Sequence, residues 1–120
     1  MAAATTISVG NKAERQAEKY LVNRGYHVVE RNFRSKLGEI DLVLKKDHAL
    51  VFVEVRYRSD STRGTPAETV TRSKIGKIIR IAEVFLLKNN RFNYYDCRFD
   101  VIAISNTLTW TDGEFTLDDY

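Results

Sequence analysis

Cysteine, histidine and proline are scarce in this 120-residue chain, which has one cysteine, two histidines and one proline. The lone Cys97 cannot form an internal disulfide, and with only His27 and His48 beside it the chain has no Cys/His zinc cluster. A catalytic thiol would need a neighbouring base, which the sequence does not advertise. These scarcities argue against soft-metal binding and thiol chemistry, and they fit a reducing compartment.

Long apolar runs are also missing. The longest runs, such as 101–104, are far too short to span a bilayer, and the first ten residues lack the basic start and the apolar core of a secretion signal. We therefore expect a cytoplasmic protein with no membrane partner. A hydrophobic content of 43% in 120 residues predicts a single domain over 1–120, with a flexible N-terminus at 1–10.

Basic residues are absent from the C-terminal part of the chain. Residues 99–120 carry five acids and no base, whereas residues 1–98 hold all 19 lysines and arginines against 11 acids, a net charge of +8. A basic body predicts an anionic partner, with nucleic acid ahead of an acidic membrane surface. Solubility alone can produce the same balance.

Two short runs rich in β-branched residues, 38–44 and 50–56, read as the strands of a hairpin with its turn at 45–48. If Lys45 pairs with Leu50, the antiparallel register places Asp41 opposite Glu54. Because side chains alternate along a strand, Arg56 shares a face with Glu54. Two carboxylates and a cation are therefore predicted to converge.

Acidic side chains among Val, Phe and Leu are costly to bury unless a cation compensates them. A hard divalent ion such as Mg²⁺ is one solution, because it takes a few carboxylate oxygens and keeps waters or substrate phosphates as its other ligands. The alternative is a set of edge-strand salt bridges between Glu54 and Arg56, with Asp41 at a turn. The residues alone favour neither.

The remaining pattern predicts helices before and after this hairpin. A first helix over 11–24 is stopped by Gly25, and Glu14 lies closer to its apolar stripe than Glu18, which turns towards water. A strand at 26–33 and a basic loop at 34–38 follow. After the hairpin come a mobile polar loop at 57–66, a helix at 67–87, a strand at 98–104, and a final hairpin of 108–110 with 115–117 across Asp112-Gly113.

Basic side chains gather around these elements. They are predicted to contact nucleic acid without reading its sequence, although an ordinary solvated face is the commoner reason for such a pattern. On the second helix, Lys74 lies at the boundary between the basic and the apolar side. The candidate nucleic-acid-binding residues are Arg34, Lys36, Arg58, Arg63, Arg72, Lys77 and Arg80.

The chain resembles the PD-(D/E)XK, or restriction-endonuclease-like, superfamily, and within it the YraN-like family of small bacterial proteins. The likeness covers most of the chain, and its specificity comes from an ordered series of motifs. These are Glu14-x-x-Ala17-x-x-Tyr20-Leu21, Gly25-Tyr26, Arg31-Asn32, Gly38-Glu39-Ile40-Asp41, Phe52-Val53-Glu54-Val55-Arg56, Pro66-x-Glu68-x-Val70-Thr71, Lys74 and Arg98-Phe99-Asp100-Val101.

The resemblance implies an α/β fold with a restriction-endonuclease-like three-layer core, a small mixed β-sheet flanked by helices. It also implies Mg²⁺- or Mn²⁺-dependent cleavage of phosphodiester bonds. By the same resemblance, Asp41 and Glu54 would be metal ligands, the backbone carbonyl of Val55 a further ligand, and Glu14 the first-helix acid that approaches the metal.

Arg56 occupies the position of the superfamily's lysine. A guanidinium has a pKa above about 12 and cannot serve as a base, but it can hold the scissile phosphate and stabilise charge developing on it. The base would then be metal-bound hydroxide or another lysine, for which Lys74 is the best candidate.

Three functions follow from these observations. The first is a metal-dependent endonuclease acting on DNA, with branched DNA preferred by analogy with resolvases, which commonly cut as homodimers. The second is a nucleic-acid-binding module that keeps the fold without catalysis, which Arg56 favours. The third is an interaction protein in which the carboxylates form a buried ion-pair network with Arg56 and Lys74.

Overall fold

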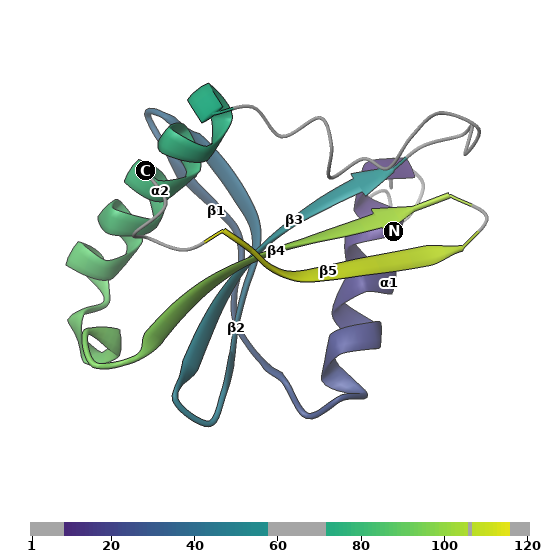
Figure 1. Cartoon of the computed structure of the whole chain (residues 1–120), viewed down its shortest axis with the longest axis horizontal. Helices are drawn as coiled ribbons and strands as arrows, with labels where there is room; N and C mark the ends of the chain where they lie inside the picture. Colours follow the sequence, from purple (N-terminus) through teal and green to yellow (C-terminus); the bar gives the residue numbers. More distant parts are fainter. Residues whose placement is uncertain (1–8, 58–71, 106, 116–120) are drawn as a thin grey trace, which may run out of the picture.

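The computed structural model describes residues 9–57, 72–105 and 107–115, without the side chains of 9–11, 112, 114 and 115 (Figure 1). The elements, in chain order, are α1 (Val9–Val22), β1 (His27–Ser35), β2 (Gly38–Lys46), β3 (Ala49–Tyr57), α2 (Arg72–Lys88), the short 3-10 helix η3 (Asn90–Phe92), β4 (Asp96–Ile104) and β5 (Leu108–Phe115). No helix within the described ranges is long and apolar enough to span a membrane.

The five strands form one mixed sheet in the order β1-β2-β3-β4-β5. Strands β3 and β4 are parallel and the other neighbours are antiparallel. The parallel pair is possible because the connection through α2 returns the chain to the end of the sheet at which β3 begins. Figure 1 shows α1 and α2 on opposite sides of the twisted sheet. This three-layer arrangement confirms the predicted α/β fold with a small mixed sheet flanked by helices.

Each helix covers its own hydrophobic core. The core under α2 is aromatic, with Phe33, Phe52, Phe85 and Phe99 in mutual contact through stacked and edge-on rings. The core under α1 is mainly aliphatic and includes Leu21. Neighbouring residues of a strand point to opposite faces, so the consecutive buried residues 42–44 of β2 and 50–53 of β3 show that the middle of both strands is covered on both sides.

The register of the β2–β3 hairpin is the predicted one, with Lys45 opposite Leu50. The predicted turn at 45–48 was too long, because Lys45 and Lys46 continue β2 and the chain reverses over Asp47 and His48. Asp47 has a φ of 54°, a left-handed conformation that aspartate tolerates better than most residues. The predicted loop at 34–38 is likewise shortened, since β1 runs to Ser35 and β2 starts at Gly38.

The final hairpin predicted from Asp112-Gly113 is wrong. Residues Leu108–Phe115 form a single strand that pairs antiparallel with β4, and the register shifts between Phe99 and Val101. Gly113 has a φ of 64° and accommodates this irregularity, and its N–H donates to the Asp100 carboxylate at 2.9 Å. The Asp-Gly pair therefore marks an irregularity within a strand rather than a turn between two strands.

Helix α1 ends at Val22, two residues before the predicted end, and Gly25 follows with a φ of 96°. Helix α2 begins at Arg72 in the described structure, so residues 67–71 of the predicted helix lie outside the described residues. The same holds for residues 1–8 of the N-terminus expected to be flexible. It also holds for nearly all of the loop expected to be mobile, including Arg58 and Arg63.

Candidate active site

Strands β2 and β3 part at Asp41. Their paired residues run from Lys46 and Ala49 to Leu42 and Val53, and the next pair in this register would be Asp41 and Glu54. Instead, the Asp41 carboxylate accepts a hydrogen bond through Oδ2 from the backbone N–H of Val55 at 2.8 Å. A side chain thus takes the hydrogen bond that a backbone carbonyl accepts in a continuous ladder.

A hollow opens where the strands part. It brings together five residues that the sequence predicted to be catalytic or metal-binding, from β2, β3 and α2. The residues lining it are Glu39, Asp41, Glu54, Val55, Arg56, Tyr57 and Lys74. The predicted convergence of Asp41, Glu54 and Arg56 is therefore present in the structure, and their chemical roles stay predictions.

Glu54 forms ion pairs with two basic side chains in this hollow. Its Oε2 lies 2.8 Å from Arg56 Nε and 2.8 Å from Lys74 Nζ. The Glu54 side chain is 22% exposed and that of Arg56 16%, so this ion pair is largely shielded from water. In this arrangement the Nζ atom of Lys74 is engaged by the Glu54 carboxylate.

Asp41 lies in a different electrostatic environment, although it lines the same hollow. Burial, helped by the nearby charges of Glu14, Glu54 and Glu39, raises the pKa of its carboxyl to about 7, although the hydrogen bond from the Val55 N–H lowers it. Negative charge at Asp41 is therefore costly without a cation.

Glu14 reaches this region from α1, but it lines a neighbouring hollow with Glu18, Arg31 and Asn32. Its Oε1 accepts a hydrogen bond from Asn32 Nδ2 at 3.0 Å. Glu18 was predicted to turn towards water; it is instead half-buried and accepts two hydrogen bonds of 2.7 Å from the Arg31 guanidinium. Arg31 accordingly lowers the pKa of Glu18.

The donor set of the Asp41 hollow fits a hard divalent cation. Asp41 and Glu54 supply carboxylate oxygens, and Mg²⁺ characteristically uses one or two carboxylates while it keeps waters or substrate phosphates. Among the residues that the structure describes, no group of three or more His, Cys, Asp or Glu side chains is arranged to hold a metal. An all-protein cage of the calcium or zinc type is thus not formed in the described ranges, whereas a two-carboxylate site fits.

The predicted nucleic-acid-binding residues that the structure describes lie on α2, on β1 and at the β1–β2 turn. Lys77 packs its aliphatic chain near Gly38, which brings α2 beside the β1–β2 turn that carries Lys36. Arg34 is 82% exposed and lies 3.6 Å from the Glu39 carboxylate. Arg72 and Arg80 are exposed on α2. Cations are therefore present on α2 and around the β1–β2 turn, near one rim of the hollow.

Comparison with known proteins places the chain in a family. The model of the uncharacterised protein family UPF0102 matches residues 13–104. The chain belongs to the UPF0102 family. A UPF0102 protein from Hahella chejuensis is 47% identical over 115 residues, covering 92% of each chain, and one from Saccharophagus degradans is 44% identical over 111 residues, covering 92% of this chain and 94% of its own. UPF0102 protein YraN from Escherichia coli is 39% identical over 113 residues, covering 92% of this chain and 86% of its own.

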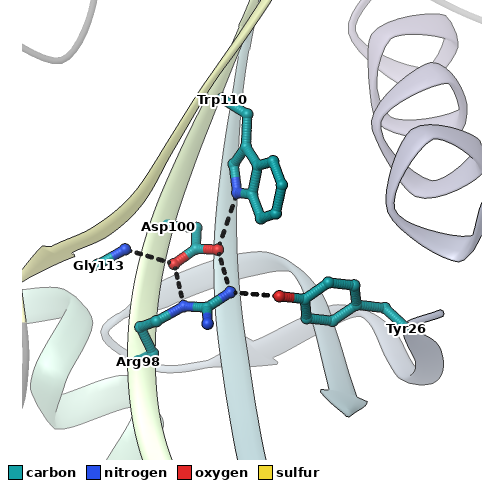
Figure 2. A network of polar contacts seen from close by, with 5 residues as sticks. All are labelled: Tyr26, Arg98, Asp100, Trp110 and Gly113. Carbon is teal, nitrogen blue, oxygen red and sulfur yellow. Dashed lines mark hydrogen bonds and ion pairs between the residues drawn. The ribbon is translucent and has the colours of Figure 1, made fainter. Parts of the chain in front are cut away.

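A second polar cluster, which the sequence did not reveal, lies on the α1 side of the UPF0102 sheet (Figure 2). Asp100 is buried and accepts four hydrogen bonds of 2.9 Å: two from Arg98, one from Trp110 Nε1 and one from the N–H of Gly113. Arg98 also donates to the Tyr26 hydroxyl at 2.8 Å. We call these five residues the Asp100 network.

The Asp100 network is structural rather than metal-binding. A carboxylate offers about four lone-pair sites, and all four are used by protein donors here. The hydrogen bonds that Arg98 donates to Asp100 and Tyr26 raise the pKa of Arg98, so that its guanidinium stays ionised. The signal in the sequence was Arg98 two residues before an aspartate in an apolar strand, the same spacing as Glu54 and Arg56, but its partners Trp110 and Gly113 come from beyond the family match.

Proposed function

We propose that this protein is a metal-dependent endonuclease that hydrolyses phosphodiester bonds in DNA. One observation carries the proposal: Asp41, Glu54, Arg56 and Lys74 line a single hollow in which the ionisation of Asp41 is opposed by burial and by three neighbouring acids. A fold gains nothing in stability from such an excess of negative charge. A bound divalent cation would remove the penalty.

In this proposal Asp41 and Glu54 hold Mg²⁺ or Mn²⁺, whose chemistry is to activate water and to neutralise charge on the phosphate. Arg56 holds a non-bridging phosphate oxygen from the floor of the hollow, where its side chain is 16% exposed. Lys74 leaves Glu54 to contact the phosphate, since it is the more exposed of the two cations at 42%. Exposed cations on α2 and the β1–β2 turn contact the DNA backbone.

A cleavage assay tests this proposal. Wild type, Asp41→Ala and Arg56→Lys are compared on branched, single-stranded and duplex DNA with Mg²⁺ or Mn²⁺. We expect metal-dependent cleavage by wild type, loss of at least about 100-fold in Asp41→Ala, and retained or increased cleavage in Arg56→Lys. No cleavage of any substrate by wild type, with Asp41→Ala indistinguishable from it, would exclude the nuclease.

A second candidate is a nucleic-acid-binding module without catalysis. The observation that favours it is the pairing of Glu54 with both Arg56 and Lys74, which satisfies this carboxylate without a metal. DNA binding should then weaken steeply with salt and survive Asp41→Ala, because a carboxylate with no metal only repels phosphate. Loss of DNA binding in Asp41→Ala would count against this module.

A further inference from the structure

Two consecutive residues of β1 reach the same helix. Arg31 binds Glu18 with two hydrogen bonds of 2.7 Å, and Asn32 donates to Glu14 at 3.0 Å. Glu14 and Glu18 are four residues apart on α1 and therefore share one face of it. Side chains of consecutive residues in a regular strand point to opposite faces of the sheet, so an ordinary strand could not make both contacts.

The backbone of Asn32 resolves this conflict. Asn32 has a φ of 51°, in the left-handed region that non-glycine residues rarely adopt and that asparagine tolerates best with aspartate. The left-handed turn brings the Asn32 amide to the α1 side, next to Arg31. The flanking pairs Arg31 with Leu42 and Phe33 with Ile40 place Asn32 across the strands from Asp41.

The contact between Asn32 and Glu14 has an electrostatic cost. Because Asn32 lies across the strands from Asp41, its hydrogen bond keeps the Glu14 carboxylate beside the strand position that carries another acid. A strained backbone that fixes an acid beside another acid does not stabilise the folded chain. The arrangement is useful only where an incoming cation converts the repulsion into attraction.

We propose that Asn32 is a positioning residue, which uses its left-handed backbone to hold the Glu14 carboxylate towards the Asp41 hollow as a further acid for a hydrated divalent cation. This inference rests on the proposed function. Asn32 acts through its hydrogen bond to Glu14, which restricts the Glu14 side chain, and not as a ligand of the cation. Arg31 and Glu18 anchor the same helix one turn away without facing Asp41.

The test is Mn²⁺ affinity, measured on the full chain by the electron paramagnetic resonance of free Mn²⁺, with thermal unfolding recorded in parallel. Asn32→Gly removes the amide and keeps access to the left-handed backbone, so its unfolding midpoint should stay close to that of wild type. We expect it to bind Mn²⁺ about tenfold more weakly, the effect of losing a partner that orients a ligand.

Two further variants separate positioning from packing. Arg31→Gln loosens the same α1–β1 contact without touching Glu14, and it should leave Mn²⁺ affinity within about twofold of wild type. In an E14Q background, Asn32→Gly should cause no additional loss, because the carboxylate that Asn32 positions is gone.

The outcomes distinguish this inference from the proposed function. The role of Asn32 is overturned if Asn32→Gly binds Mn²⁺ as tightly as wild type does, or if it weakens Mn²⁺ binding equally with and without E14Q. In either case, weaker Mn²⁺ binding by Asp41→Ala would still support the metal site. An Asp41→Ala variant that binds Mn²⁺ as wild type does, or a wild type that binds none, overturns both.

Discussion

Two aspartates on neighbouring parts of one sheet show how differently a carboxylate can be accommodated. Asp100 has a side chain that is 0% exposed, and four protein donors surround it. Asp41 is less buried, yet the described part of the chain gives it one backbone donor and three acidic neighbours. Burial therefore does not decide how costly the charge of a carboxylate is; the balance of donors and charges around it does.

We expect the largest effect on stability at Asp100, whose carboxylate accepts four hydrogen bonds from protein donors. Asp100→Ala leaves the Arg98 guanidinium and the N–H groups of Trp110 and Gly113 without their acceptor, in a buried site. We expect the free energy of unfolding, measured by urea denaturation, to fall by about 3–5 kcal/mol. A loss below about 1 kcal/mol would show that the network is not what holds β5 against β4.

Asp41→Asn should act in the opposite direction. The pKa of Asp41 is raised in the folded protein from 3.8 to about 7, so the folded state binds more protons than the unfolded state between these values and wild type loses stability as pH rises through them. At pH 8 the asparagine variant should be about 1–3 kcal/mol more stable than wild type, and the difference should vanish near pH 4.

A matched control lies at the other end of the same strand pair. Asp47→Asn changes an exposed residue whose left-handed turn conformation suits both side chains. Its free energy of unfolding should stay within about 0.5 kcal/mol of wild type at both pH values. An Asp41→Asn variant less stable than wild type at pH 8 would mean that the hollow stabilises its carboxylate after all.

Trp110→Phe removes a single donor from the Asp100 network. The ring keeps its edge-on packing against Tyr20 and Tyr26, so the loss isolates the hydrogen bond from Nε1 to Asp100. We expect about 1–2 kcal/mol of destabilisation by urea denaturation. A cost as large as that of Asp100→Ala would mean that the network fails as a unit rather than bond by bond.

The smallest expected effect is the response to metal. Mn²⁺ at about ten times its dissociation constant should stabilise wild type by about 1.4 kcal/mol in thermal unfolding, and a chelator should reverse the shift. Mn²⁺ should stabilise Trp110→Phe by the same amount as wild type, although this variant is less stable without metal. It should not stabilise Asp41→Asn. An equal shift in Asp41→Asn would place the metal elsewhere.

The parts of the fold that depend on local pattern could be predicted from the sequence. Two apolar runs with a polar turn between them suggested the pairing of Lys45 with Leu50, and this register predicted the approach of Asp41 to Glu54. The helical spacing of apolar residues gave α1 and α2 within a few residues where they are described. These signals need no knowledge of distant segments.

Other features depend on partners far along the chain, and for this reason the sequence misled. Asp112-Gly113 has the composition of a hairpin turn, but Gly113 donates to an aspartate 13 residues earlier, and this bond favours a bulged strand. The left-handed Asn32 is likewise supported by Glu14, 18 residues away on another element. Nothing in the residues adjacent to Asn32 announces that the strand alternation fails there.

Both outer strands of the sheet are irregular, and this affects how the molecule meets other copies of itself. In β1 the register shifts between Val28 and Glu30 and the backbone turns left-handed at Asn32, while in β5 it shifts opposite Phe99 and Val101 and turns left-handed at Gly113. An irregular edge is a poor template for the backbone of another chain. The left-handed residues Asn32 and Gly113, which donate to Glu14 and Asp100, therefore make both outer strands of the described sheet poor templates for edge-to-edge aggregation.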